Sequence, residues 1–214
     1  MKILYINPNS THSMTEGIVA AARAACPEAE IAGVTNAAGP ASIEGPADGD
    51  AAVPGVLAEV ARAEADAIVI ACFDDTGLAE AQAAAQVPVL GIGQASYLMA
   101  ALMGRRFGVV TSVAAAIPVI EGNIAAAGFG ANCAGVRASG LAVLAIDEGS
   151  EAVRAHLAAE ILRARDAGAQ AVVLGCAGMA PLRGDLAKRT GVALIDGVAA
   201  SAQLAVAAAG YARL

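Results

Sequence analysis

Large aromatic side chains are scarce in this chain of 214 residues. It contains no tryptophan, three phenylalanines and three tyrosines, and aromatic residues make up 3% of the sequence. Hydrophobic residues nevertheless reach 57%, and much of that share is alanine. We therefore expect helices that pack closely through small side chains, rather than a core built around large rings.

Positive charge is also in short supply. The chain has 13 lysines and arginines against 20 aspartates and glutamates, which gives a formal net charge of −7. A protein that binds nucleic acid needs a basic surface to neutralise phosphates. The composition therefore predicts no nucleic-acid partner.

Long apolar runs and metal-binding motifs are missing as well. The apolar stretches have the length of strands or are alanine-rich helices interrupted by charge or glycine, so we expect no membrane span. Met1-Lys2 leads directly into a short apolar run, which predicts no signal peptide and a cytoplasmic protein with four free thiols. No CxxC motif or Cys/His cluster is present, and His12 and His156 are the only histidines. We expect neither a metal nor a cofactor.

Strand-like and helix-like segments alternate along the whole chain. This alternation predicts an α/β fold with parallel sheets covered by helices. Ser13 and Glu16 form a capping-box pattern at the start of the first helix, and the Gly- and Pro-rich residues 36–50 predict a long loop. The expected strands are 3–6, 31–34, 67–71, 88–92, 107–110, a weak segment near 136, 171–174 and 192–195, and the expected helices include 13–25, 53–64, 78–85, 95–103 and 198–209.

The two halves of the chain repeat each other at an offset of 104 residues. An apolar run ends on Cys72 in the first half and on Cys176 in the second, and the same offset maps residues 3–6 onto 107–110 and 89–90 onto 193–194. A duplicated α/β unit would place the two strand ends across a shared cleft, where open α/β sheets bind ligands. Two thiols would then face each other, as a two-base proton-transfer site requires.

This repeat predicts two pseudo-symmetric lobes, each a parallel sheet of about four strands flanked by helices, with the active site between them. The symmetry suggests that the helix after each fourth strand crosses to the other lobe. We therefore expect residues 1–92 and 198–214 to form the first lobe, and residues 93–197 to form the second.

A single cysteine after an apolar strand is more often a small core residue than a catalytic one. The constant offset between Cys72 and Cys176 favours the catalytic interpretation for this pair. Cys26 and Cys133 have neither a strand-end position nor a matching partner, so we interpret both as structural.

Polar residues after the first strand of each half are candidates for substrate contacts. Asn9 and Ser10 in the first half and Thr111 in the second could contact a small ring, although an Asn-Pro turn that caps a helix would have the same sequence. Asp74 and Asp75 could orient a thiol or bind a ring N–H, and a solvated turn pair fits them equally well.

As a set, these segments resemble the aspartate/glutamate racemase superfamily, and within it the hydantoin racemase and allantoin racemase branch. The resemblance implies two α/β lobes and racemisation without metal or cofactor through two cysteines, which correspond to Cys72 and Cys176. The segments that carry it span nearly the whole chain and are residues 6–11 (INPNST), 42–45 (SIEG), 71–78 (ACFDDTGL), 107–111 (FGVVT), 174–179 (LGCAGM) and 195–198 (IDGV).

The residues that follow each cysteine depart from the amino-acid racemases of the superfamily. Those enzymes usually have Asn-Thr and Thr-His, where this chain has Phe73-Asp74 and Ala177-Gly178. The replaced groups handle the charged ends of an amino acid, so their loss favours a neutral or weakly acidic ring. We predict a racemase of 5-substituted hydantoins that acts by two-cysteine proton transfer at C5, with these four residues lining the site.

Other functions on the same scaffold remain open. An allantoin racemase or an aspartate or glutamate racemase would keep both thiols. A maleate isomerase or an arylmalonate decarboxylase would use cysteine differently, and a two-lobed binding protein would need the cleft but not the thiols. In each case the partner is a small molecule, and the alanine-rich helices favour a homo-oligomer.

Overall fold

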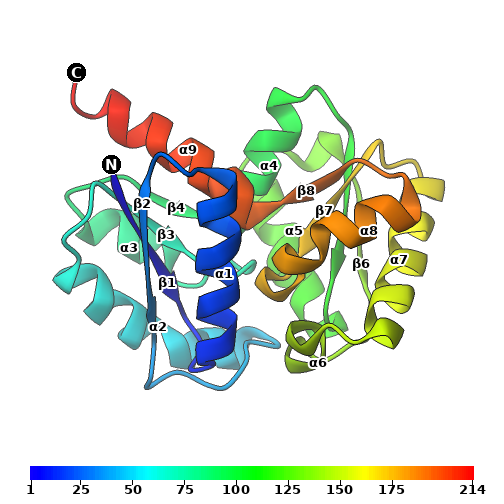
Figure 1. The fold of residues 1–214 in the computed structure, drawn as a ribbon, viewed down its shortest axis with the longest axis horizontal. Coiled ribbons are helices and arrows are strands. Elements are labelled where there is room, and N and C mark those ends of the chain that lie inside the picture. The colour runs from blue at the N-terminus through cyan, green and yellow to red at the C-terminus, as the bar shows by residue number, and fades with distance from the viewer.

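The computed structural model describes residues 1–214 and contains two parallel four-stranded sheets side by side, each flanked by helices (Figure 1). The strand orders are β2-β1-β3-β4 and β6-β5-β7-β8. The two-lobed α/β fold predicted from the sequence is confirmed.

The first lobe holds β1 (Lys2–Asn7), α1 (His12–Ala25), β2 (Glu30–Thr35), α2 (Pro46–Arg62), β3 (Ala67–Ile70), α3 (Leu78–Ala84) and β4 (Val89–Gly91). The remaining elements are α4 (Ile92–Leu102), β5 (Phe107–Thr111), η1 (Ala114–Ala116), α5 (Ile117–Ala126), η2 (Gly130–Asn132), β6 (Cys133–Ala138), α6 (Val143–Glu148), α7 (Glu151–Asp166), β7 (Ala171–Gly175), η3 (Ala177–Leu182), α8 (Arg183–Thr190), β8 (Leu194–Asp196) and α9 (Gly197–Tyr211).

The central strands of both sheets are buried along their whole length. Every residue of β3, β5 and β7 is buried, because helices cover both faces of each sheet. Parallel strands of this kind are continuous apolar runs rather than alternating ones, which is why the sequence pattern identified them.

The pairing registers repeat between the lobes. Ile3 pairs with Ala67 in the first sheet, and Phe107 pairs with Ala171 in the second, which preserves the offset of 104. At the fourth strands the offset is 105, because Val89 pairs with Ile68 while Leu194 pairs with Val172. The sequence-based mapping of 89–90 onto 193–194 was therefore wrong by one residue.

Two helices connect the lobes. Helix α9 leaves β8 of the second sheet and packs against α1 and β3 of the first, and in Figure 1 it runs from between the lobes over the first lobe. The buried Tyr5 hydroxyl of β1 anchors α9 by donating to the Val198 carbonyl at 3.0 Å. Helix α4 follows β4 and packs against α5, β7 and β8. The division into residues 1–92 with 198–214 and residues 93–197 remains our proposal.

Two details of the first lobe differ from the sequence-based expectations. Helix α1 starts at His12, one residue before Ser13, and Thr11 at the N-cap makes no side-chain capping bond, so the capping-box prediction was wrong. Ser13 instead donates to Asp147 in the second lobe at 2.8 Å. Helix α2 starts at Pro46, a residue type well suited to the first helical turn, and this shortens the expected loop.

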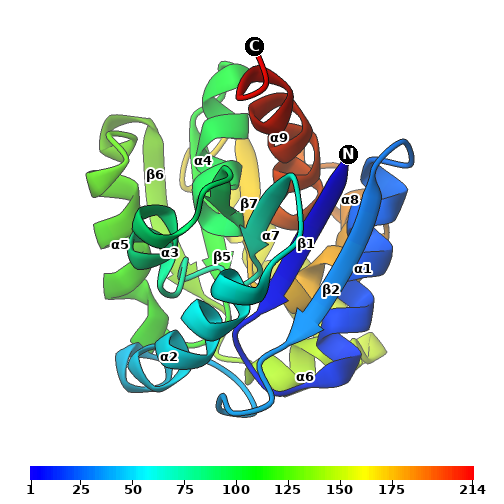
Figure 2. The same ribbon diagram turned by 90° about the vertical axis from the view of Figure 1, so that its left-hand side faces the viewer.

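The helices of the two lobes are short or charged. None combines the length and the continuous apolar surface needed to cross a membrane. In Figure 2, α2 and α3 of the first lobe lie on the side facing the viewer.

Candidate active site

The two cysteines predicted to be catalytic line one cavity between the lobes. Cys72 follows β3 and Cys176 follows β7, so each thiol comes from the carboxyl end of a central strand. The cavity volume is about 30 Å³, which holds only about two water molecules. The lining residues are Asn9, Met14, Ile43, Ala71, Cys72, Phe73, Asp74, Thr111, Ser112, Ala116, Val143, Gly175, Cys176 and Ala177.

The two turns that carry the thiols share one backbone hydrogen bond. The Asp75 N–H donates to the Cys72 carbonyl at 3.0 Å, and the Met179 N–H donates to the Cys176 carbonyl at 3.0 Å. In each turn, the backbone N–H two residues after the cysteine, from Asp74 or Gly178, lies beside the thiol and lowers its pKa. Gly178 is not among the residues that line the cavity, and it acts on the Cys176 thiol through its backbone N–H.

Burial raises the pKa of both thiols, because a desolvated thiolate is unfavourable. The pKa of Cys176 rises to about 12 through burial, while the Gly178 N–H acts in the opposite direction. The pKa of Cys72 rises further, through burial and the nearby Asp74 carboxylate. The Thr76 hydroxyl lowers the pKa of Cys72 and has no oxygen or nitrogen partner. Both groups are therefore thiols at neutral pH, and a proton must leave one of them before it can act as a base.

Asp74 is the ionisable side chain placed to act on both thiols. Burial raises the pKa of its carboxyl to about 6, and no hydrogen bond holds the side chain. Asn123 of α5 fixes the backbone instead, by donating to the Asp74 carbonyl at 2.9 Å. Above pH 6 this carboxylate is charged, and it raises the pKa of Cys72 and of Cys176.

Replacing Asp74 with asparagine should lower the pKa of both thiols, because a negative charge beside each of them is removed. The rate of alkylation by iodoacetamide at a fixed pH near 8 should then rise at Cys72 and Cys176, by roughly tenfold for each pKa unit. Peptide mass spectrometry of timed samples measures the rate at each thiol.

Asp147→Asn is the matched control, since the Asp147 charge raises the pKa of Cys176 but does not act on Cys72. That variant should accelerate alkylation at Cys176 alone. Equal alkylation rates in wild type and Asp74→Asn would show that the carboxylate does not control the thiols.

The residues after β1 are organised by a buried amide network. Asn7 donates to the Asn9 side-chain oxygen at 2.9 Å, and Asn9 donates to the Met14 sulfur at 3.1 Å. This network places Asn9 in the cavity wall. Ser10 does not line the cavity, because its hydroxyl donates to the Pro40 carbonyl at 3.2 Å and holds the following loop.

Thr111, Phe73 and Ala177, which were also predicted to contact the substrate, line the cavity. The Thr111 hydroxyl donates to the Gly175 carbonyl at 2.9 Å, so its hydrogen is already engaged. The Phe73 ring packs edge-on against Tyr97, with 5.9 Å between the ring centroids. Ala177 lies in the wall beside Cys176. No lysine, arginine or histidine is among the lining residues.

Several lining residues were not predicted as site residues. Met14, Ile43, Ala116 and Val143 supply apolar surface, and Ser112 supplies a hydroxyl. Ile43 belongs to the SIEG segment noted in the sequence and Ser112 follows Thr111, so a local signal existed for these two. Nothing in the sequence around the other three marks them as functional.

A loop of the first lobe is hydrogen-bonded to the second lobe at the cavity. The Val143 N–H at the start of α6 donates to the Glu44 carboxylate at 2.8 Å. Ile43 and Val143, beside this bond, both line the cavity. Together with the bond between Ser13 and Asp147, this contact joins the first lobe to α6 beside the cavity.

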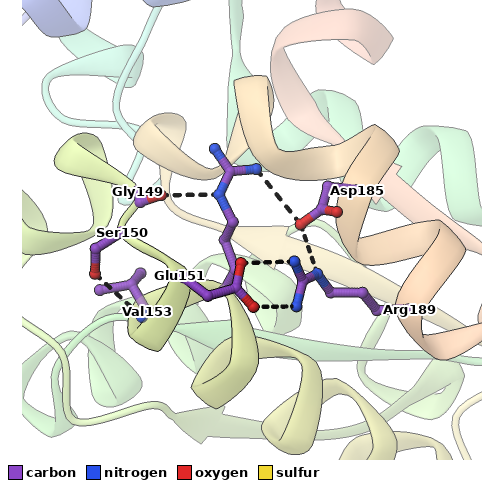
Figure 3. Close-up of polar contacts among 7 residues, drawn as sticks. Gly149, Ser150, Glu151, Val153, Asp185 and Arg189 are labelled. Atoms are coloured by element: carbon purple, nitrogen blue, oxygen red, sulfur yellow. Dashed lines mark hydrogen bonds and ion pairs between the residues drawn. The ribbon is translucent and has the colours of Figure 1, made fainter.

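Ion pairs between α7 and α8 brace the second-lobe wall, as Figure 3 shows. Arg189 contacts both Glu151 oxygens, at 2.7 and 2.8 Å, and Asp185 at 2.7 Å. Arg154 donates to the Gly149 carbonyl at 2.8 Å, just after α6. Because these groups are exposed to solvent, the pairs contribute little to stability. They hold α6 in place rather than supply much of the stability.

The remaining two cysteines lie away from the cavity. Cys26 is buried just after α1, where its thiol donates to Glu28 at 3.1 Å. Cys133 begins β6, at the end of the sheet opposite the cavity. The histidine, cysteine, aspartate and glutamate side chains nowhere gather in groups of three or more that could hold a metal ion.

Comparison with known proteins identifies one group of relatives. A family model described as Asp/Glu/Hydantoin racemase matches residues 3–205. Hydantoin racemase of Rhizobium meliloti is 44% identical over 99% of this chain and 91% of its own length. Hydantoin racemase of Pseudomonas sp. (strain NS671) is 38% identical over 96% and 84%. The structure of allantoin racemase from Klebsiella pneumoniae aligns with a TM-score of 0.93 and 37% identity, over 99% of this chain and 89% of that one.

Proposed function

The chain belongs to the Asp/Glu/hydantoin racemase family and is an isomerase of the hydantoin racemase type, and from this premise we propose that it racemises 5-substituted hydantoins by proton transfer between Cys72 and Cys176. The resemblance inferred from the sequence is thus confirmed at the level of the family. The substrate and the role of each thiol are our proposal.

One observation carries the proposal, namely two thiols from opposite lobes in a cavity without a cation. A racemase needs an acid and a base on opposite faces of a carbon atom, and Cys72 and Cys176 come from opposite sides of the interface. An amino acid would bring a carboxylate beside Asp74 with no lysine, arginine or histidine to pair with it. Burying that unpaired charge is costly, whereas a hydantoin ring is neutral.

The proposed reaction is a two-step proton transfer at C5. One cysteine, as a thiolate, removes the C5 proton, and the electron pair of the C–H bond moves toward the C4 carbonyl to form an enolate. The other cysteine, as a thiol, then donates its proton to the opposite face of C5. The two cysteines exchange roles for the other enantiomer, so the enzyme returns to its starting state after one forward and one reverse turnover.

Backbone N–H groups in the two turns are placed to stabilise the two negative charges of the reaction, the thiolate and the enolate oxygen. The Asp74 and Gly178 N–H groups already contact the thiols, so they stabilise a thiolate when it forms. We propose that the N–H groups of these turns also hold the enolate oxygen. Fixed backbone donors need no rearrangement during the reaction, and this makes them effective.

Polar lining groups match the edges of a hydantoin ring. The ring has two carbonyl acceptors and two N–H donors. Asn9 and Ser112 supply side-chain donors, and the Asp74 carboxylate can accept from a ring N–H. The apolar side chains of Met14 and Ile43 are placed to contact the substituent at C5.

We propose that the lobes separate to admit the substrate, because the cavity between the cysteines measures about 30 Å³ in this structure. The Glu44–Val143 bond is the contact that opening must break on the α6 side. We propose that the 42–45 loop moves with the first lobe during opening.

Allantoin is the second candidate substrate, because it is a hydantoin with a ureido group at C5. The structural similarity to allantoin racemase from Klebsiella pneumoniae favours it. The wall that would face this group contains Met14, Ile43 and Val143, which offer no hydrogen bonds to a ureido group. We therefore propose that 5-alkyl hydantoins are better substrates than allantoin.

Two further features of the protein are proposals. Leu98, Leu102 and Met103 are exposed together at the end of α4, and this apolar surface favours a homo-oligomer. The four cysteines are unpaired, which favours a reducing compartment such as the cytoplasm.

The proposal is tested by following optical rotation with an L-5-alkyl hydantoin. The rotation should decay to zero without added cofactor and should be unaffected by EDTA, because the base is a thiolate. Iodoacetamide should abolish the decay through alkylation of Cys72 and Cys176. Loss of activity in EDTA that is restored by a divalent cation would refute the thiol mechanism.

A further inference from the structure

The helices that cross between the lobes have different N-terminal caps. Helix α9 starts after Asp196, whose carboxylate accepts from the Val198 and Ala199 N–H groups at 2.9 and 3.3 Å. This is an ordinary local N-cap. Helix α4 starts after Gly91, which occupies the equivalent position in the first lobe and has no side chain.

Asp75 supplies the missing cap from a distance of 18 residues. Its carboxylate accepts from the Gly93 N–H at 2.8 Å and from the Gln94 N–H at 2.7 Å, the same two helix positions that Asp196 caps in α9. A Cβ at Gly91 would overlap this carboxylate, and a Cβ at Gly93 would overlap the Phe73 carbonyl. Because Gly91 and Gly93 have no side chains, the turn after Cys72 can pack directly against the start of α4.

The position of Asp75 links this cap to the catalytic turn. Asp75 lies three residues after Cys72, and its N–H donates to the Cys72 carbonyl at 3.0 Å. It is the only residue other than glycine with a positive φ, at 52°, a conformation that costs free energy for most residues. In the second lobe, the residue three positions after Cys176 is Met179, which has no such role.

Helix α4 carries this link into the second lobe. Its Tyr97 ring stacks on Phe107 of β5, with centroids 5.7 Å apart, and meets Phe73 edge-on. The helix also packs against β7, the strand that ends at Cys176. A chain of direct contacts therefore runs from the Cys72 turn through Asp75 and α4 to the sheet that holds the other thiol.

We infer that Asp75 is a positioning residue that sets the separation of the Cys72 and Cys176 thiols by capping α4. This inference rests on the proposed two-thiol function. Asp75 does not line the catalytic cavity, so it acts through Cys72 rather than on the substrate.

The test compares Asp75→Gly with Asp75→Asn. Glycine adopts a positive φ freely, so the first variant removes the carboxylate without straining the turn. Its kcat for a 5-alkyl hydantoin should fall roughly ten- to hundredfold with a smaller change in KM, since a small displacement of a reacting group has effects of this size. Asparagine tolerates the same backbone conformation and keeps an acceptor, so the second variant should recover part of kcat.

Asp196→Ala is the matched control, because it removes the cap of α9 without touching either cysteine turn. It should lower the melting temperature while kcat stays within about twofold of wild type, as expected for a purely structural cap. A similar loss of kcat in Asp196→Ala and Asp75→Gly would overturn the inference.

A second readout does not depend on turnover. Dibromobimane bridges two thiols a few ångström apart, and peptide mass spectrometry identifies the bridge between Cys72 and Cys176. Its yield should fall in Asp75→Gly and recover in Asp75→Asn. An unchanged yield and unchanged kcat in folded Asp75→Gly would refute the positioning role. If wild type forms the bridge but racemises no hydantoin, the proposed function fails while the bridging yield still decides the role of Asp75.

Discussion

Replacing either Cys72 or Cys176 with serine is expected to abolish racemisation, with a loss of at least roughly 10²–10⁴-fold in kcat. A serine hydroxyl is far less acidic than a thiol, so it cannot serve as the base at C5. Each cysteine is needed once per turnover, as base or as acid, so the two variants should be equally inactive. Optical rotation of a 5-alkyl hydantoin measures the loss, and circular dichroism checks the fold.

Cys26→Ser and Cys133→Ser are the matched controls. Both cysteines are far from the cavity, so both variants should keep near-normal turnover, although Cys26 is buried and its replacement lowers stability. Near-normal racemisation in Cys72→Ser or Cys176→Ser would contradict the two-base mechanism. Loss of turnover in a well-folded control variant would contradict the assignment of the other two cysteines.

Selectivity for rings over free amino acids is the second large expected effect. At equal concentration, a 5-alkyl hydantoin or allantoin should racemise while aspartate and glutamate show no detectable change. The cavity contains the Asp74 carboxylate and no lysine, arginine or histidine, so a free carboxylate would be buried unpaired. In addition, the C5 proton of a hydantoin is more acidic than the α-proton of an amino acid, because its neighbouring carbonyl is not an ionised carboxylate.

A panel of these four substrates, followed by polarimetry at one pH, measures this selectivity. The ratio of kcat/KM between the 5-alkyl hydantoin and allantoin also tests the apolar wall formed by Met14, Ile43 and Val143. Faster turnover of aspartate or glutamate than of any hydantoin would move the chain to the amino-acid racemases and would overturn the proposed substrate class.

The fold and the cysteine pair could be predicted because their signals are local and repeated. A buried parallel strand is a continuous apolar run, and two such runs end on cysteine at the same offset. The constant offset does not extend to the edge strands: Val89 of β4 corresponds to Leu194 of β8, an offset of 105, and Val34 of β2 corresponds to Arg137 of β6, an offset of 103. Sequence comparison between the halves cannot locate such shifts when neither segment has a distinctive residue.

The contacts between lobes could not be predicted from the same pattern. Ser13 was expected to cap its own helix, yet its hydroxyl donates to Asp147 of the second lobe. Val143, which lines the cavity, donates its backbone N–H to the Glu44 carboxylate of the first lobe. The cap that Asp75 gives to α4 spans 18 residues and depends on a glycine at the usual capping position. Each of these contacts joins residues whose proximity arises only after the lobes have packed.

Deuterium exchange at C5 tests the central claim that each thiol serves one face of the substrate. Each enantiomer of a 5-alkyl hydantoin is incubated in D₂O with Cys72→Ser or Cys176→Ser, and NMR follows the C5 proton above the spontaneous rate. The two-thiol mechanism predicts that each variant exchanges the proton of one enantiomer without racemising it, and that the two variants act on opposite enantiomers. Exchange of the same enantiomer by both variants, or of both enantiomers by one variant, would contradict it.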